Sequence, residues 1–441
     1  MARRRVNRGW LGRHAGVVGF VVGAGAGILA TAVIIVYVVP ALRPGPRWEP
    51  GTLVILSGTD EGFGGQRQSL IDQWNALPDR PDAEIIPIAG GTTAQRAEMV
   101  DYAQAGGRGV DIYNLDVTLI AEFADFGYLR SLDEATVDFD GFLPGPLRTC
   151  QRGDRLWALP FNTDAALLYY RTDLVPAGPA PTSWAGITNT IETVFTARRT
   201  DERLVAGYAG QLRDYEGLTV NAIEAIWAAG GEVVDDSGDV VVDSPEAREG
   251  LRRLASGLSA GNPQLVLPDS REHDESGSTQ AFRDGRVVFM RNWPVAYRSL
   301  LAGGESSAPA VPFDVARIPG RSVLGGQNLA VAATSDQPRA AQELIQFLTG
   351  PRSQQILFER GGFAATREVV YSDPAVRANF PYAGALLDAI QQADLRPVTP
   401  YYALFSEVFR QGVRQALTNG GELPPGFANR LANALKGITT E

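Results

Sequence analysis

Short hydrophobic runs alternate with amphipathic segments over the first third of the chain beyond its N-terminal region. The runs 52–56, 84–88 and 110–115 are rich in the residues that favour strands. Between them, segments 66–77 and 92–105 carry hydrophobic residues at helical spacing. This order predicts a parallel sheet covered by helices on both faces, with ligands bound beyond the carboxyl ends of its strands.

The middle and the end of the chain continue the mixed pattern. Segments 157–161 and 166–170 are typical of two strands, and the polar residues 162–164 between them predict a turn. Segment 338–348 is typical of a helix that ends before a glycine-proline pair. Residues 386–435 are mostly helical in pattern. Strand and helix patterns together predict that the chain is an α/β protein.

The N-terminal region has the pattern of a membrane anchor. Residues 1–15 hold five arginines, and the 24 residues 16–39 are uncharged and mostly apolar. A helix of that length spans about 36 Å, enough for a bilayer. We therefore expect a cytoplasmic tail at 1–15, a transmembrane signal anchor at 16–39, a proline-rich linker at 40–50 and an extracytoplasmic body at the cell membrane. The alternative is a cleaved signal peptide and a secreted body, although such peptides usually have an apolar region of only about 7–15 residues.

Glycine recurs every fourth residue in this apolar segment, at Gly19, Gly23 and Gly27. That spacing lets two membrane helices approach closely, so a dimer of anchor helices is one interpretation. The other interpretation is that glycine is simply frequent in membrane segments.

Charge is distributed unevenly along the chain. The net charge is −10, but residues 1–47 hold seven of the 40 basic residues and no acidic residue, which leaves the remainder with 33 basic and 50 acidic residues. A body with a net charge of −17 is a poor binder of nucleic acid. The chain has one cysteine, Cys150, and two histidines, His14 and His273. These numbers exclude a cysteine-based zinc cluster or a multi-histidine metal centre within one chain, and we expect no metal or other cofactor.

Acidic, amide and aromatic residues gather near the ends of predicted strands. Carboxylates accept hydrogen bonds from hydroxyl groups, and aromatic faces cover the C–H patches of a sugar ring. This set therefore favours binding of a neutral sugar, with no catalytic residue. Its members are Asp60, Glu61, Asp116, Asn162, Asp164, Tyr215, Glu216 and Trp293.

Two enzyme classes are alternatives to binding. Residues 257–261 match the GxSxG pattern of serine hydrolases, but that serine must lie on a strand-to-helix turn, whereas Ser259 follows the end of a predicted helix. Glycoside hydrolases need a pair of carboxylates, and with 50 acidic residues such a pair stays an alternative.

Several motifs resemble family 1 extracellular solute-binding proteins, the capture subunits of sugar ABC importers, and most closely their trehalose/maltose-binding branch. The most specific is QAFRDGRVVFMRNWP at 280–294, followed by RPVTPYY at 396–402 and FNTDAALLYYRTDL at 161–174. YEGL at 215–218, WAAGG at 227–231 and VDSPEA at 242–247 fit the same family. The resemblance covers about residues 51–440.

The resemblance implies a two-lobed, periplasmic-binding-protein-like (type II) α/β fold with an interlobe cleft. It places residues 51–161 and 311–366 in an N-lobe, and residues 162–310 and 367–441 in a C-lobe. It also implies which residues contact the sugar. These are Glu61, Arg96, Asp116, Asn162, Asp164, Tyr215, Glu216, Trp293, Gly326 and Arg396, together with Gln327, which stands where the branch usually has a tryptophan after two glycines.

The resemblance implies capture of a sugar, such as the disaccharides trehalose or maltose, and its delivery to the permease subunits of an ABC transporter. The replacement of a stacking ring by the amide of Gln327 puts the identity of the sugar in question. A second hypothesis is a membrane-tethered sugar sensor that signals to a membrane partner, and a third is a glycoside hydrolase.

Overall fold

The computed structural model describes residues 48–439 except 108, 176, 198–200 and 303–310. Residues Glu49–Glu441 form one compact unit. The expected cytoplasmic tail, the anchor and most of the linker lie outside the described residues. Among the helices that the structure describes, none is long and apolar enough to cross a bilayer.

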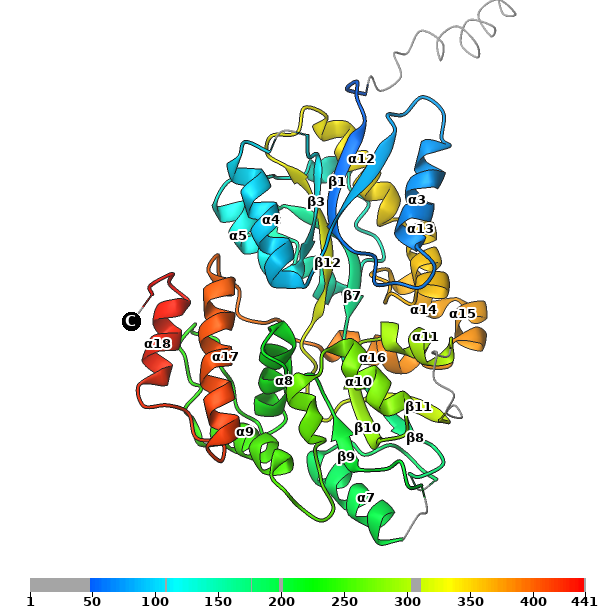
Figure 1. Cartoon of the computed structure of the whole chain (residues 1–441). Coiled ribbons are helices and arrows are strands. Elements are labelled where there is room, and N and C mark those ends of the chain that lie inside the picture. The colour runs from blue at the N-terminus through cyan, green and yellow to red at the C-terminus, as the bar shows by residue number, and fades with distance from the viewer. Residues whose placement is uncertain (1–47, 108, 176, 198–200, 303–310, 440–441) are drawn as a thin grey trace, which may run out of the picture. The chain divides into compact units, whose positions relative to one another are not determined.

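The first lobe is built on a six-stranded sheet (Figure 1). β1 (Leu53–Gly58) lies between β2 (Ala83–Ile88) and β3 (Ile112–Asp116), and is parallel to both. The predicted parallel start of the chain is therefore confirmed. β12 (Gly325–Ala332) returns from far along the chain and pairs antiparallel with β3, with β4 (Leu129–Arg130) and with β7 (Ala158–Asp164).

Amphipathic helices cover this sheet. α3 (Gln66–Asn75) buries Leu70, Ile71 and Trp74, which recur at the helical spacing seen in the sequence. The other elements of this part of the chain are α4 (Thr92–Gln104), α5 (Ile120–Asp125), α6 (Pro144–Arg148), the hairpin of β5 (Gln151–Arg152) and β6 (Arg155–Leu156), α12 (Pro338–Leu348) and α13 (Pro351–Ile356).

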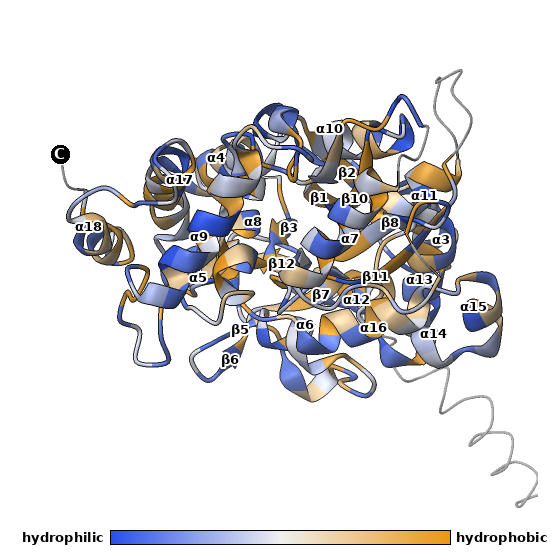
Figure 2. Cartoon of the chain, turned by 90° about the horizontal axis from the view of Figure 1, so that it is seen from below, coloured by the Kyte–Doolittle hydropathy of each residue, from blue (hydrophilic) through white to orange (hydrophobic). Residues whose placement is uncertain are grey.

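The second lobe has a four-stranded sheet in the order β11 (Phe313–Arg317), β8 (Leu167–Arg171), β10 (Val287–Asn292) and β9 (Ala206–Ala209). Its core packs α8 (Glu216–Trp227), α9 (Pro245–Leu258) and α17 (Tyr402–Thr418) together through residues such as Phe405 and Phe409, which are fully buried. Figure 2 shows that the helices carry both hydrophilic and hydrophobic positions. The helices of this part are α7 (Trp184–Thr196), α8 (Glu216–Trp227), α9 (Pro245–Leu258), α10 (Glu275–Arg283), α11 (Val295–Leu301), α14 (Glu368–Ser372), α15 (Pro374–Asn379), α16 (Ala383–Gln392), α17 (Tyr402–Thr418) and α18 (Phe427–Ala434).

The chain passes between the lobes at Ala165 and Ala166, which join β7 to β8, at 318–324, which join β11 to β12, and again between α13 and α14. Segment 393–398 joins α16 to α17 of the second lobe and lies against the second passage, since the backbone of Asp394 donates to Ser322 O at 2.9 Å and accepts from Leu324 N at 2.8 Å. We call the meeting of 165–166, 318–324 and 393–398 the crossing point, and these three stretches its segments.

Two expectations are corrected here. Residues 162–164 are not a turn, because β7 continues to Asp164 and pairs with β12, so β7 and β8 lie in different sheets. β11 falls in the range 311–366 that we assigned to the N-lobe, but it pairs with β8 of the second sheet. The first error arose because polar residues inside a buried strand have the composition of a turn. The second arose because a hydrophobic pattern does not reveal which sheet a strand will join. The remaining lobe boundaries stay a prediction.

Candidate ligand-binding site

Four of the predicted residues meet at one corner of the first sheet. Gln327 in β12 lies opposite Asp116 at the end of β3 and opposite Asn162 in β7. Asp164 ends β7, and its carboxylate accepts a hydrogen bond of 3.4 Å from Asn162 Nδ2. Antiparallel pairing of β12 with both neighbours thus brings together residues that are far apart in the sequence.

Gly326 has a backbone role at this corner. Its φ is +118°, and a Cβ atom there would lie 2.2 Å from Asn162 O. Only glycine fits both the conformation and the space. Gly326 therefore lets β12 approach β7 closely enough to align Gln327.

The side chain of Gln327 is held by two donors. Its Oε1 accepts from Arg67 Nη2 and, at 3.2 Å, from Asn114 Nδ2. No hydrogen bond from its Nε2 to another described residue occurs, and that atom is not among the buried unpaired ones. The amide of Gln327 therefore has its oxygen in use and its N–H groups available.

Arg67 was missed by the sequence analysis. Its side chain is 5% exposed and lies over the rings of Phe161 and Phe363, at 5.6 and 4.9 Å from the ring centroids. Burial lowers the pKa of this guanidinium, and the charges of Asp60, Glu61 and Asp164 oppose that shift. The available signal was an arginine at the start of a helix that follows two glycines, which is too common to stand out.

The carboxyl group of Asp164 is strongly affected by this environment. Burial, together with the negative charge of Asp116, raises its pKa from 3.8 to about 7, and the charges of Arg67 and Arg291 act in the opposite direction. Near neutral pH this carboxyl group can therefore either accept or donate a hydrogen bond.

The second lobe contributes an aromatic corner. Trp293 follows β10, and its Nε1 donates to Glu275 Oε1 at 3.2 Å. A Cβ atom on Gly325, next to Gly326, would lie 3.6 Å from the Trp293 ring and 3.3 Å from Asp164 Cβ. Trp293 thus lies against the end of the first sheet. Burial and the charge of Glu275 raise the pKa of the neighbouring Tyr215.

Arg396 joins the two lobes. Its Nη1 donates to Glu216 Oε1 at 2.7 Å, at the start of α8, and its Nη2 donates to Asp116 Oδ1 at 3.3 Å. Glu216 also accepts from Tyr402 OH and, at 2.6 Å, from Ser406 Oγ. Arg396 is 5% exposed, so a buried guanidinium from segment 393–398 connects a carboxylate of each lobe.

Two predicted residues are not brought into this set. Glu61 is exposed in the loop after β1, where its charge acts on Arg67. Arg96, on α4, forms a two-point ion pair with Glu122 of α5, with Nε 2.7 Å from Oε2. The described contacts therefore place Arg96 in the packing of the first lobe.

Several buried polar atoms in this region lack a hydrogen-bond partner among the described residues. They are Asn114 Oδ1, Asn162 Oδ1, Arg67 Nε and Arg396 Nε. Buried polar groups are normally paired. Their gathering around one corner indicates a place where an exchangeable polar molecule completes the hydrogen bonding. No group of three or more potential metal ligands occurs in the described part of the chain.

Ser259 of the GxSxG match lies just beyond the C-terminus of α9. That is the helix-end position expected from the sequence, and not the strand-to-helix turn that a nucleophilic serine needs.

Known proteins resemble most of this chain. The maltose-bound structure of MalE3 from T. maritima is 30% identical, with a TM-score of 0.77, and the match covers 88% of this chain and 99% of that one. A probable ABC transporter-binding protein of Deinococcus radiodurans is 29% identical over 354 residues, which are 76% of this chain and 81% of that protein. A mannitol-binding protein of Pseudomonas aeruginosa is 26% identical over 333 residues, 69% of this chain and 72% of that protein.

The similarity to MalE3 establishes the two-lobed α/β fold of periplasmic binding proteins. Residues 79–381 match the profile of the bacterial extracellular solute-binding proteins. The chain therefore belongs to the family of bacterial extracellular solute-binding proteins.

Proposed function

We propose that the protein captures a neutral sugar or polyol between its two lobes and delivers it to an ABC importer. The observation that carries the proposal is the set of buried, unpaired polar atoms beside Arg396. These atoms come from the first lobe and from segment 393–398, and Trp293 of the second lobe lies against the same corner. A ligand placed there would touch all three.

The chemistry of this set suits a polyhydroxylated molecule. Asp116, Asp164 and Asn162 supply acceptors, whereas Arg396 and the amide of Gln327 supply donors. Each sugar hydroxyl both donates and accepts, so it can pair with either kind. The ring of Trp293 supplies a flat surface for C–H groups.

The relatives support the same class of ligand. MalE3 was solved with maltose bound, and one relative is named a mannitol-binding protein. A disaccharide such as maltose or trehalose is our first proposal, as the family motifs imply. Gln327 favours a ligand with a hydroxyl group, and not a bare ring face, next to β12.

Capture would work by lobe closure and requires no chemical step. A ligand that binds groups of both lobes stabilises the closed arrangement. The size of this effect equals the difference between the binding free energies of the ligand for the closed and the open arrangement. The anchor expected at 16–39 would hold the body at the outer face of the membrane, beside the permease subunits.

Isothermal titration calorimetry and thermal unfolding of the full chain, kept in a detergent without a sugar headgroup, test the proposal. The panel contains maltose, trehalose, glucose, tagatose, mannitol and, as charged controls, glucuronate and glucosamine. A sugar at 100 times its dissociation constant adds about 2.7 kcal/mol to the free energy of unfolding. Stabilisation by neutral members supports the proposal, whereas stabilisation by none of them, or by the charged controls alone, contradicts it.

A further inference from the structure

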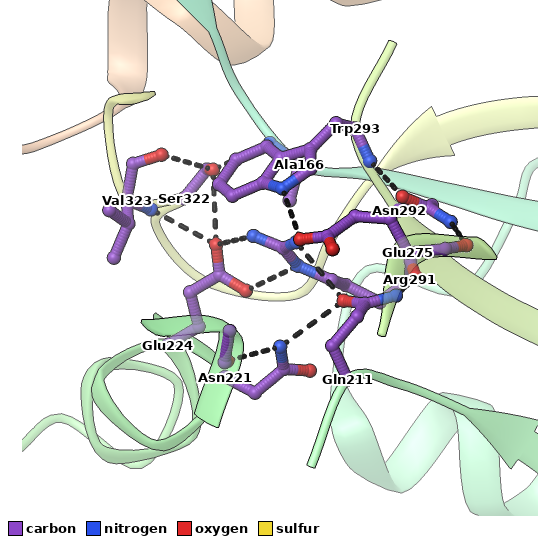
Figure 3. A network of polar contacts seen from close by, with 11 residues as sticks. Ala166, Gln211, Asn221, Glu224, Glu275, Arg291, Asn292, Trp293, Ser322 and Val323 are labelled. Atoms are coloured by element: carbon purple, nitrogen blue, oxygen red, sulfur yellow. Dashed lines mark hydrogen bonds and ion pairs between the residues drawn. The ribbon is translucent and has the colours of Figure 1, made fainter. Parts of the chain in front are cut away.

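Arg291 lies directly beneath the indole of Trp293. Its Cζ is 3.8 Å from the ring centroid, and the guanidinium is 1% exposed, at the end of the fully buried strand β10 (Figure 3). An arginine at this distance occupies one face of the ring, so a stacked ligand would have to use the other face. The sequence signal was an arginine inside a run of buried strand residues, VVFMRN.

The guanidinium of Arg291 is itself fixed by Glu224 of α8. Nε donates to Oε2 at 2.9 Å, and Nη2 donates to Oε1 at 2.8 Å. Gln211 completes the arrangement, because its Oε1 accepts from Arg291 Nη1 at 3.2 Å and its Nε2 donates to Arg291 O at 2.8 Å. A buried pair of this kind costs desolvation, so two-point geometry and extra hydrogen bonds are needed to hold it.

Glu224 also binds the crossing point. Its Oε1 accepts from Val323 N at 3.1 Å and from Ser322 Oγ at 3.2 Å (Figure 3). The same Ser322 Oγ accepts from Ala166 N at 2.7 Å. The carboxylate of Glu224 therefore holds segment 318–324 directly and Ala166 through Ser322, and the backbone bonds of Asp394 add segment 393–398.

We infer that Glu224 and Arg291 are positioning residues that couple the crossing point to the binding face of Trp293. A rotation of the crossing segments moves the donors that hold Glu224, and Glu224 moves the guanidinium beneath the ring. Coupling of this kind is reciprocal, so a ligand on Trp293 stabilises one arrangement of the crossing segments. The ligand part of this inference rests on the proposed function.

Arg171 offers a matched control. It is another buried arginine of the same sheet, 1% exposed, whose Nη2 binds Asp201 at 2.9 Å. Its described contacts include neither Trp293 nor the crossing segments. Arg171→Met and Arg291→Met thus remove the same charge from two side chains of equal exposure, and only the second breaks the proposed coupling.

The experiment measures two properties of the full chain, in a detergent without a sugar headgroup. The first is the dissociation constant for maltose and for mannitol. The second is the near-UV circular dichroism of Trp293, taken as the difference between each protein and the same protein with Trp293→Phe. We expect Arg291→Met and Glu224→Gln to weaken binding about tenfold and to reduce the Trp293 signal. Arg291→Lys should restore part of the sugar affinity and part of the Trp293 signal. Arg171→Met should lower the melting temperature and leave the affinity and the signal unchanged.

Wild-type affinity and an unchanged Trp293 signal in Glu224→Gln and Arg291→Met would overturn the inference. Equal losses in Arg171→Met would also overturn it, because they would show a general effect of destabilisation. If the parent protein binds neither maltose nor mannitol, the proposed ligands are wrong. In that case the Trp293 signal of the ligand-free proteins tests the inference by itself. If Arg291→Met does not fold, Glu224→Gln provides the same test.

Discussion

Arg396 binds the carboxylate of Glu216 at 2.7 Å, across 180 positions of the sequence. The same guanidinium reaches Asp116 of the other lobe at 3.3 Å. Because all three side chains belong to different segments, this contact fixes where segment 393–398 lies relative to the two carboxylates.

Replacement of Arg396 by methionine should therefore affect both stability and binding. It leaves two carboxylates without their cation, and removing one partner of a buried pair costs about 3–5 kcal/mol. Chemical denaturation should show this loss, and calorimetry should show little or no sugar binding. Arg321→Met is the control, since Arg321 pairs with Asp394 but is 39% exposed, and such pairs contribute only about 0–1 kcal/mol. Equal effects of the two substitutions would contradict the role of Arg396.

Trp293→Ala should weaken sugar binding while the fold survives. The ring supplies a contact surface at the end of the first sheet, and aromatic contacts contribute about 0.5–1.5 kcal/mol beyond the area they bury. We expect about a tenfold rise in the dissociation constant measured by calorimetry. The control is Trp227→Ala, whose ring lies beneath Arg321. Unchanged affinity in Trp293→Ala would remove this residue from the site.

Gln327→Glu should separate stability from binding. The carboxylate still accepts from Arg67 and Asn114, so the melting temperature should be maintained. It removes the amide N–H groups, however, and a hydrogen bond is typically worth about 0.5–1.5 kcal/mol. Calorimetry should therefore show a dissociation constant about three- to tenfold higher. Full affinity would mean that the amide does not donate to the ligand.

Asp164→Asn should change the dependence of stability on pH. The folded-state pKa of Asp164, about 7, is above the ordinary value of 3.8, so the folded protein holds an extra proton between these values. Its stability should decline as pH rises from about 4 to 7 and should level off above. The asparagine variant lacks this decline. One pKa unit corresponds to about 1.4 kcal/mol. Because the side chain is only half-buried, we expect the free energy of unfolding of the variant minus that of the parent to be about 2 kcal/mol larger at pH 8 than at pH 4. Denaturation series at the two pH values check this, and parallel curves for both proteins would contradict it.

Gly326→Ala should be strongly destabilising, because the new Cβ would lie 2.2 Å from Asn162 O at a φ of +118°. Gly384→Ala is the matched control. Gly384 lies within α16, where an added Cβ would come within 4 Å of no other atom of the described residues beyond the helix's own backbone and the two neighbours in sequence, so alanine should stabilise the protein by about 0.5–1 kcal/mol. Opposite shifts in melting temperature are expected, and a tolerated Gly326→Ala would show that β12 can move away from β7.

The sequence predicted the elements of the first lobe well, because their hydrophobic spacing is strong and local. α3 and α4 begin at the expected residues, Gln66 and Thr92. Asn162 to Asp164 were misread since their polarity imitates a turn, whereas they complete a buried strand. The pairing of β11 with β8 depends on which sheet edge is free, and no local pattern records that.

The candidate site was predictable in part. The family motifs indicated Asp116, Glu216, Trp293 and Arg396, which the structure brings to one region. Arg67 and Glu224 were missed because buried charges are rare and their value depends on partners far away in the sequence. Only the fold shows that Glu224 faces Arg291 and the crossing point.

The place of β12 has a consequence for how the chain folds. This strand is the partner that joins β3 to β4 and β7, yet it is synthesised after β8, β9, β10 and β11 of the other lobe. A polypeptide appears from its N-terminus, so β3 keeps an unpaired edge until residue 332 has been made. The first lobe thus cannot close before most of the second has been translated. Such a delay keeps the first lobe incomplete during synthesis, which suits the passage of the body across a membrane that we propose.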